Sequence, residues 1–190
     1  MSEFEFVFAL YSLLLGLSMV ELLGGLGRAL ETRFAAEAEH GKFSIGWLTP
    51  LLAIFVMLDL LSFWVSAWRV RDDVAVSSSA LMAVVAFAGV YFLAARLVFP
   101  SHPEGFANLD THYFRVRRLA FGLLLALLAA QIAYYASHPD LSKILMQPRP
   151  LAMTAFFVVL IAAAMWVKGR RASIAVLSLL IARYVLVNLL

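Results

Sequence analysis

The sequence contains no cysteine, and this absence excludes several kinds of site at once. The 190 residues can form no disulfide, thiolate metal centre, thioether-linked haem or cysteine nucleophile. We expect no cofactor. Charged residues are also scarce, at 14% of the chain, whereas soluble domains carry about 25%. Because hydrophobic residues reach 64%, the composition indicates a membrane protein.

The alternation of polar and apolar residues that marks the strands of a membrane barrel is also missing. The hydrophobic residues instead form six continuous runs, and a helix crosses a bilayer with about 17–25 such residues. Helices satisfy their own backbone hydrogen bonds in lipid, so the sequence predicts an all-α integral membrane protein with six transmembrane helices. The runs are 6–26, 45–68, 78–99, 119–136, 151–167 and 172–190.

The segments between the runs are too short for a second folded domain, so residues 1–190 are expected to form a single transmembrane domain. Glu3 and Glu5 stand where a secretory signal would be positive, and the first run is therefore expected to be retained. The net charge of +3 does not indicate nucleic-acid binding. Basic residues in a small membrane protein orient it and contact acidic lipids.

Lysine and arginine are divided unequally between the two sides of the predicted membrane domain. The side that holds both termini carries four of them, Arg69, Arg71, Lys143 and Arg149. The opposite side carries ten: Arg28, Arg33, Lys42, Arg96, Arg115, Arg117, Arg118, Lys168, Arg170 and Arg171. Positive charge collects on the cytoplasmic side, so we expect both termini outside the cytoplasm in a plasma (inner) membrane.

The two halves of the chain, 1–99 and 112–190, share several features. Glu21 in the first run aligns with Gln131 in the fourth, and the second and fifth runs both open with Pro-Leu, at Pro50 and Pro150. A duplicated unit of three crossings must insert in opposite directions, which gives the inverted repeat found in many transporters. Leucine-rich runs also align by chance, so duplication and coincidence both stay open.

Two segments at the predicted cytoplasmic side of the membrane domain lead to further expectations. Residues 28–40 are expected to form a helix with Leu30 and Phe34 on one face and Gly41 as its end. This segment is either an amphipathic helix in the membrane interface or a continuation of the first transmembrane helix. Arg96, near the cytoplasmic end of the third run, is expected to reach the interface and to have no buried role.

A few charged residues lie inside the hydrophobic runs. A charge near the bilayer centre costs about 2.5–3.5 kcal/mol, so such residues normally face the bundle interior and pair with one another. Asp59 lies about 20 Å and Arg183 about 17 Å from the cytoplasmic ends of their runs, and we expect them to form an ion pair. Glu21 either joins this pair or faces a cytoplasmic vestibule. The uncharged polar residues expected nearby are Ser62, Gln131, Tyr184 and Asn188.

These intramembrane residues support two interpretations. In the first, they line the pathway of a channel or secondary transporter for an ion or small solute. In the second, the buried charges only fix helix packing, and the protein is a scaffold, sensor or effector subunit whose basic loops bind a cytoplasmic partner. Ser12 and Gly16 have the small-residue spacing that allows close helix contact within the bundle or in a homo-oligomer.

Signatures of enzymes are missing from the sequence. There is no nucleophile elbow, Ser–Lys pair or intramembrane protease motif, so we expect no enzymatic activity. His102 and His112, with nearby carboxylates, are weak candidates for a metal site, because their spacing matches no established motif. A membrane-embedded metal enzyme is therefore the third interpretation.

Overall fold

The computed structural model describes residues 3–38, 42–71 and 76–189, with side chains described up to Val187. Apart from one isolated bridge between Ser44 and Asn108, the described ordered elements are helical. The helices are α1 (Glu3–Ala38), α2 (Leu48–Arg69), α3 (Ser78–Val98), α4 (Leu109–Ser137), α5 (Pro139–Leu145), α6 (Pro148–Trp166) and α7 (Arg170–Leu189), with a 3₁₀ turn, η1 (Pro103–Gly105), before α4.

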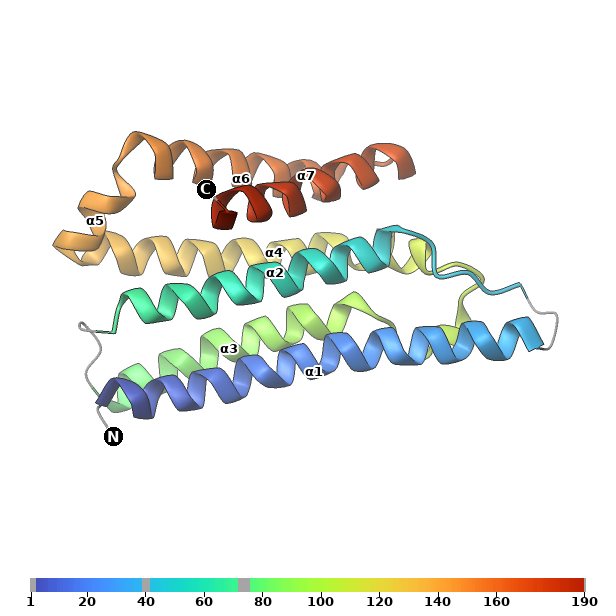
Figure 1. Cartoon of the computed structure of the whole chain (residues 1–190), viewed down its shortest axis with the longest axis horizontal. Coiled ribbons are helices and arrows are strands. Elements are labelled where there is room, and N and C mark those ends of the chain that lie inside the picture. Colours follow the sequence, from blue (N-terminus) through green and yellow to red (C-terminus); the bar gives the residue numbers. More distant parts are fainter. Residues whose placement is uncertain (1–2, 39–41, 72–75, 190) are drawn as a thin grey trace.

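The long helices run back and forth along one axis (Figure 1). The N-terminus, the α2–α3 connection and α5 lie at one end, which we call the near end. The α1–α2, α3–α4 and α6–α7 connections lie at the opposite end, which we call the far end. Side-chain caps start two of these helices, because Ser77 Oγ accepts from Ala80 N and Asn108 Oδ1 accepts from Asp110 N, at 3.1 and 2.7 Å.

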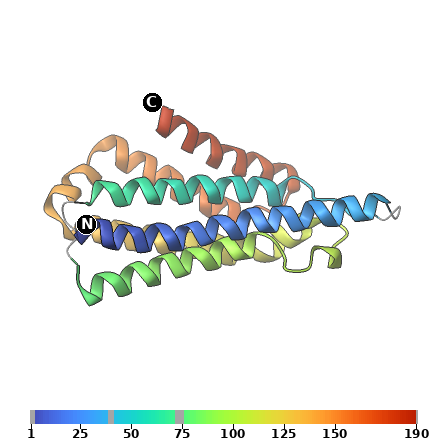
Figure 2. The ribbon, with the colours of Figure 1, turned by 60° about the horizontal axis from the view of Figure 1, so that its bottom comes forward.

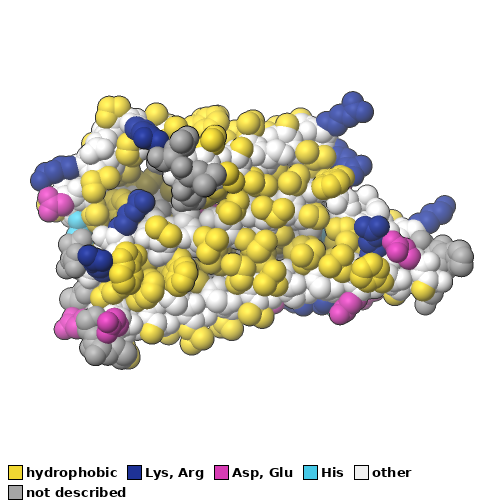
Figure 3. Space-filling model, in the orientation of Figure 1, with side chains coloured by type: hydrophobic (Ala, Val, Ile, Leu, Met, Phe, Trp, Pro, Cys, Tyr) yellow, Lys and Arg dark blue, Asp and Glu magenta, His cyan; other side chains and the backbone are white. Residues whose placement is uncertain are grey.

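Five described helices, α1 to α4 and α6, are long and apolar enough to cross a membrane. Hydrophobic side chains cover the middle of the face in Figure 3, and charged side chains gather toward its two ends. The prediction of an all-α protein is confirmed, and the helices have the character of a membrane protein. The sixth predicted span corresponds to α7, which is not among the five and carries Arg170, Arg171 and Arg183 in 20 residues.

The packing of the described helices does not confirm the inverted repeat. The most extensive contact joins α1 to α3, and a two-fold repeat would require an equally extensive contact between α4 and α7. Instead, α4 packs on α3 and α6, and α7 packs on α2 and α6. The short helix α5 also has no described helical counterpart in the first half. Pro50 and Pro150 are each the third residue of their helix, so the Pro-Leu pairs do occupy matching positions, but the packing around α2 and α6 does not confirm a duplication.

Helix α1 continues without a break to Ala38, so its 36 residues span about 54 Å. Figure 2 shows its C-terminal part extending beyond the other helices at the far end. Of the two interpretations of residues 28–40, the continuation of the first helix is confirmed as far as Ala38. The expected stop at Gly41 lies outside the described residues. Phe34 on this extension is 63% exposed.

A set of bonds around Asp110, which we call the far-end clasp, fastens the α1–α2 connection to α4 and α7. Asp110 Oδ1 accepts from the backbone N–H of Leu48 at 2.9 Å, and Oδ2 pairs with Arg170 Nε at 2.7 Å. Gly46 lies against the same carboxylate with a φ of +70°. Nearby, the Thr49 hydroxyl donates to the carbonyl of Leu109 at 2.9 Å. The clasp therefore ties three helices together at one end of the bundle.

Candidate functional site

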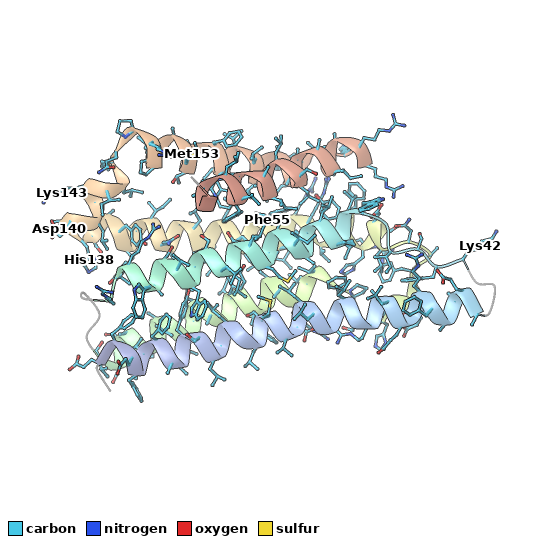
Figure 4. All side chains as sticks on the ribbon, in the orientation of Figure 1. Lys42, Phe55, His138, Asp140, Lys143 and Met153 are labelled. Atoms are coloured by element: carbon cyan, nitrogen blue, oxygen red, sulfur yellow. The ribbon has the colours of Figure 1, made fainter. Side chains whose placement is uncertain are left out.

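A hollow with polar lining residues, a cavity of about 770 Å³, lies among α2, α4, α5, α6 and α7. We call it the arginine cavity. Its volume lies in the range of small-molecule sites, which are about 300–1,000 Å³. Most of its wall is apolar, and Met153 of α6, labelled in Figure 4, belongs to that wall. The polar and ionisable lining residues are Asp59, Ser62, Ser66, Arg69, Gln131, Tyr135, Arg149, Thr154, Arg183 and Tyr184.

Asp59 is the most buried charged residue of this cavity, with 3% of its surface exposed. The hydroxyl of Tyr184 donates to Asp59 Oδ1. The hydroxyl of Tyr91 lies 3.3 Å from Oδ2, but it also lies 2.7 Å from the carbonyl oxygen of Val56. A tyrosine has one hydroxyl hydrogen. When Tyr91 gives it to Val56, the contact with Oδ2 is a hydrogen bond only if Asp59 itself carries a proton.

Arg183 lies on the same cavity but does not form the expected ion pair with Asp59 among the described residues. Its guanidinium lies over the rings of Phe157 and Tyr184, with its central carbon 4.3 and 5.1 Å from the ring centres. Its Nε is buried and has no hydrogen-bond partner. Neighbouring helix positions point about 100° apart, and Tyr184 is the residue that faces Asp59. The depths of Asp59 and Arg183 were predictable, whereas the rotation of α7 was not.

Two further arginines lie where the cavity meets the near end of the bundle. Arg69 is the last residue of α2 and Arg149 is near the start of α6, and both are exposed. In the sequence, these two arginines indicate only how the chain is oriented across the membrane. The signal that would have placed them together is their position, because each ends or begins a span on the same side of the membrane. The described lining therefore contains three arginines and one carboxylate.

Two rings of the cavity wall, Phe157 and Tyr184, belong to a set of packed rings that we call the aromatic cluster: Phe55, Phe121, Phe157 and Tyr184. The ring of Phe55 lies 5.7 Å from that of Phe121 and 6.1 Å from that of Phe157. Phe55, which Figure 4 labels near the middle of the bundle, is fully buried. The aromatic cluster therefore connects the wall of the arginine cavity to the buried core of the bundle.

Glu21 does not join Asp59, and this corrects one of the two options given for it. Its carboxylate pairs with Arg28 at 3.0 Å and with Arg96 of α3. Arg96 also donates to the hydroxyl of Ser101 at 3.0 Å. The side chain of Arg96 is 39% exposed, and it links α3 to the partly buried Glu21 of α1, a contact that the sequence did not predict. These groups lie outside the arginine cavity.

Of the other predicted site residues, some line the arginine cavity and some do not. Ser62, Gln131 and Tyr184 line the arginine cavity. The side chain of Asn188 lies outside the described residues. Gln131 also lines a second cavity of about 670 Å³ among α1, α2, α3 and α4, whose wall is almost entirely apolar. The hydroxyl of Ser12 on α1 accepts from the indole N–H of Trp64 on α2 at 2.9 Å.

The structure does not bring His102 and His112 into a metal-binding group. His112 is buried, with Nε2 3.0 Å from the carbonyl oxygen of Leu97. His102 is exposed and lies 3.1 Å from Glu104. A backbone N–H and the His102 ring hold the pKa of Glu104 below its usual value. In the described part of the chain, no group of three or more metal-ligating side chains could hold an ion.

Arg117 is a residue whose importance the sequence analysis missed. It is 5% exposed, and its guanidinium donates to the carbonyl of Val167 and lies 3.5 Å from the carbonyl of Ala164. It thus satisfies carbonyls at the end of α6 that have no partner within the helix. Its spacing from the buried Tyr113 and Ala120 would have revealed this, because residues three and four apart share a helix face.

No protein-family model, curated protein or solved structure matches this chain.

Proposed function

We propose that the protein is a secondary transporter for an ion or small solute, and that the arginine cavity is its solute-binding site. The observation that carries this proposal is a cavity that runs from the near end to the buried Asp59 and the partly buried Arg183. Ionisable groups at such a depth are costly and usually serve a transport pathway.

The aromatic cluster favours a transporter over an open channel. A channel needs a continuous polar path, whereas Phe157 and Tyr184 of the cavity wall pack against the fully buried ring of Phe55. A transporter exposes its site to one side at a time, and the arrangement corresponds to a state that is open at the near end. In this proposal α7 is the sixth span, both termini lie outside the cytoplasm, and the cavity is open to that outer side.

Replacing either Asp59 or Arg183 is expected to abolish transport in reconstituted liposomes. Solute uptake is measured with a panel of small carboxylates, amines, sugars and alkali ions, and Asp59→Asn and Arg183→Gln should each reduce it at least about tenfold. An interaction of 1.4 kcal/mol corresponds to a factor of ten, and a buried charged hydrogen bond contributes about that much or more.

The matched control variants are Glu21→Gln and His102→Ala. Both remove polar or charged groups that lie outside the arginine cavity, so uptake should stay within about twofold of wild type. Equal uptake by wild-type and Asp59→Asn liposomes would refute the proposal. Wild-type liposomes that take up none of the panel would do the same.

A second candidate function is a membrane scaffold or effector subunit, and one observation favours it. The end of α1 extends beyond the bundle and exposes Phe34 (Figure 2). The neighbouring cations Arg115 and Arg118 are also exposed, whereas Arg117 is buried and is not available to a partner. In this case wild type transports nothing, and reversing the charge at Arg115 and Arg118 releases a bound cytoplasmic protein from membranes.

A further inference from the structure

The arginine cavity carries an excess of positive charge. Its described lining includes Arg69, Arg149 and Arg183, and Asp59 is the single acidic residue. A hollow with walls of low dielectric constant concentrates the field of such charges, so it attracts ions of the opposite sign. The described lining therefore favours an anion over a cation as the solute.

Arg183 is the residue best placed to bind the anionic group. The rings of Phe157 and Tyr184 lie close to its guanidinium and fix its plane, while its buried Nε has no hydrogen-bond partner. An unpaired buried donor is costly, and a bound anion would satisfy it. The planar fork of an arginine matches the two oxygens of a carboxylate.

The rest of the wall indicates the nature of the solute beyond its charge. Apolar side chains from α4, α6 and α7 surround Arg183, including Ile132, Phe156 and Leu179. A fully hydrated inorganic anion gains little from such a wall, whereas an organic anion buries its apolar body there. The cavity volume of about 770 Å³ leaves room for a molecule of several rings or a short chain.

While Asp59 is ionised, its negative charge repels a bound anion and competes with that anion for Arg183. The ionisable groups that face Asp59 are otherwise tyrosines: Tyr91 from α3, Tyr184 from α7, Tyr11 from α1 and Tyr135 from α4. Arg183 is the nearest cation to it on the cavity wall. A proton on Asp59 removes the competing charge and lets Oδ2 donate to Tyr91, whose own hydrogen is engaged by Val56.

We propose that the solute is a small organic anion whose acidic group binds Arg183, and that a proton on Asp59 strengthens its binding. This inference rests on the proposed function for its choice of cavity and names the solute class of that same site. Transport would then carry the anion together with a proton. Arg69 and Arg149 attract the anion to the opening and contribute less to its final binding.

The test measures binding to purified protein in nanodiscs of zwitterionic phosphatidylcholine, by equilibrium dialysis at pH 7.5. Benzoate, benzyl alcohol and benzylamine share one ring and differ in charge. Benzoate should bind at least about tenfold more tightly than the other two, and Arg183→Gln should weaken it about tenfold. Arg149→Gln, at the opening, should weaken benzoate binding only about two- to threefold, and this loss should vanish at high salt.

A second variant tests the role of Asp59 in the opposite direction. Asp59→Asn should bind benzenesulfonate several-fold more tightly than wild type at pH 7.5, a gain that misfolding cannot produce. Benzenesulfonate stays ionised between pH 5.5 and 7.5. Its affinity for wild type should therefore rise as the pH falls and Asp59 gains its proton, while its affinity for Asp59→Asn should stay constant.

The outcomes separate this inference from the transport proposal. Benzylamine binding as tightly as benzoate, or an Arg183→Gln variant that keeps full benzoate affinity, would overturn the anion assignment. Uptake of amines or alkali ions without benzoate binding would leave transport standing and refute the anion site. Benzoate binding without uptake of any carboxylate would support the anion site and refute transport.

Discussion

An alanine at Gly46 is expected to destabilise the protein by about 2–4 kcal/mol. Gly46 has a φ of +70°, a region in which residues with a side chain are strained. The added methyl would lie 2.2 Å from Asp110 Oδ1, so the carboxylate would have to move. It would then lose its bonds to the Leu48 N–H and to Arg170, and the far-end clasp would open.

The measurement is the loss of folded protein on heating in a mild detergent, followed by intrinsic tryptophan fluorescence. Gly27→Ala is the matched control, because Gly27 lies inside α1 and an added methyl meets nothing within 4 Å. Alanine is the better helix former by about 0.5–1 kcal/mol, so this control should be slightly more stable than wild type. Equal behaviour of the two alanine variants would contradict the clasp.

Arg117→Met is expected to cost about 2–3 kcal/mol, the second largest effect. Methionine fills similar space, but it removes the donor to the carbonyl of Ala164 and leaves that of Val167 only the Ser173 hydroxyl, 3.5 Å away. It also removes the stacking of the guanidinium on Phe114, whose ring centre lies 4.9 Å away. The expected result is a lower unfolding temperature and earlier loss of α6 protection in hydrogen exchange.

Arg118→Met provides the control at the adjacent position. It removes the same charge from the same side of the bundle, but Arg118 is exposed, and its guanidinium lies 4.7 Å from the ring centre of Trp166. Its loss should cost no more than about 1 kcal/mol. If both methionine variants lose equal stability, the loss reflects the removed charge, and the hydrogen bonds from Arg117 to the end of α6 contribute nothing.

The helices of this protein could be predicted because a hydrophobic run specifies its own length and depth. The sequence located Asp59 and Arg183 at similar depth, and both line one cavity. It could not show that Tyr184 would face Asp59, since adjacent residues on α7 compete for the inward position. That choice depends on how the rings of Phe55 and Phe157 pack, which no local pattern contains.

Pairings between distant helices were the hardest to predict. Glu21 pairs with Arg96 because α1 packs along α3, and nothing in either run specifies that neighbour. The burial of Arg117 was hidden for a different reason, since it stands in a row of cations that resembled an exposed loop. Its helical spacing from Tyr113 predicts that Arg117 faces the core, whereas the row of charges predicts an exposed segment.

The bonds of Asp110 have a mechanical consequence for the shape changes that the bundle can undergo. They anchor the first turn of α7 through Arg170, whereas Figure 2 shows the opposite end of α7 diverging from its neighbours. Once the hydrogen bond between Tyr184 and Asp59 breaks, α7 can swing about this fixed end. A tilt of about 10° about this fulcrum would displace the free tip of a 20-residue helix by about 5 Å, widening or narrowing the hollow beside it.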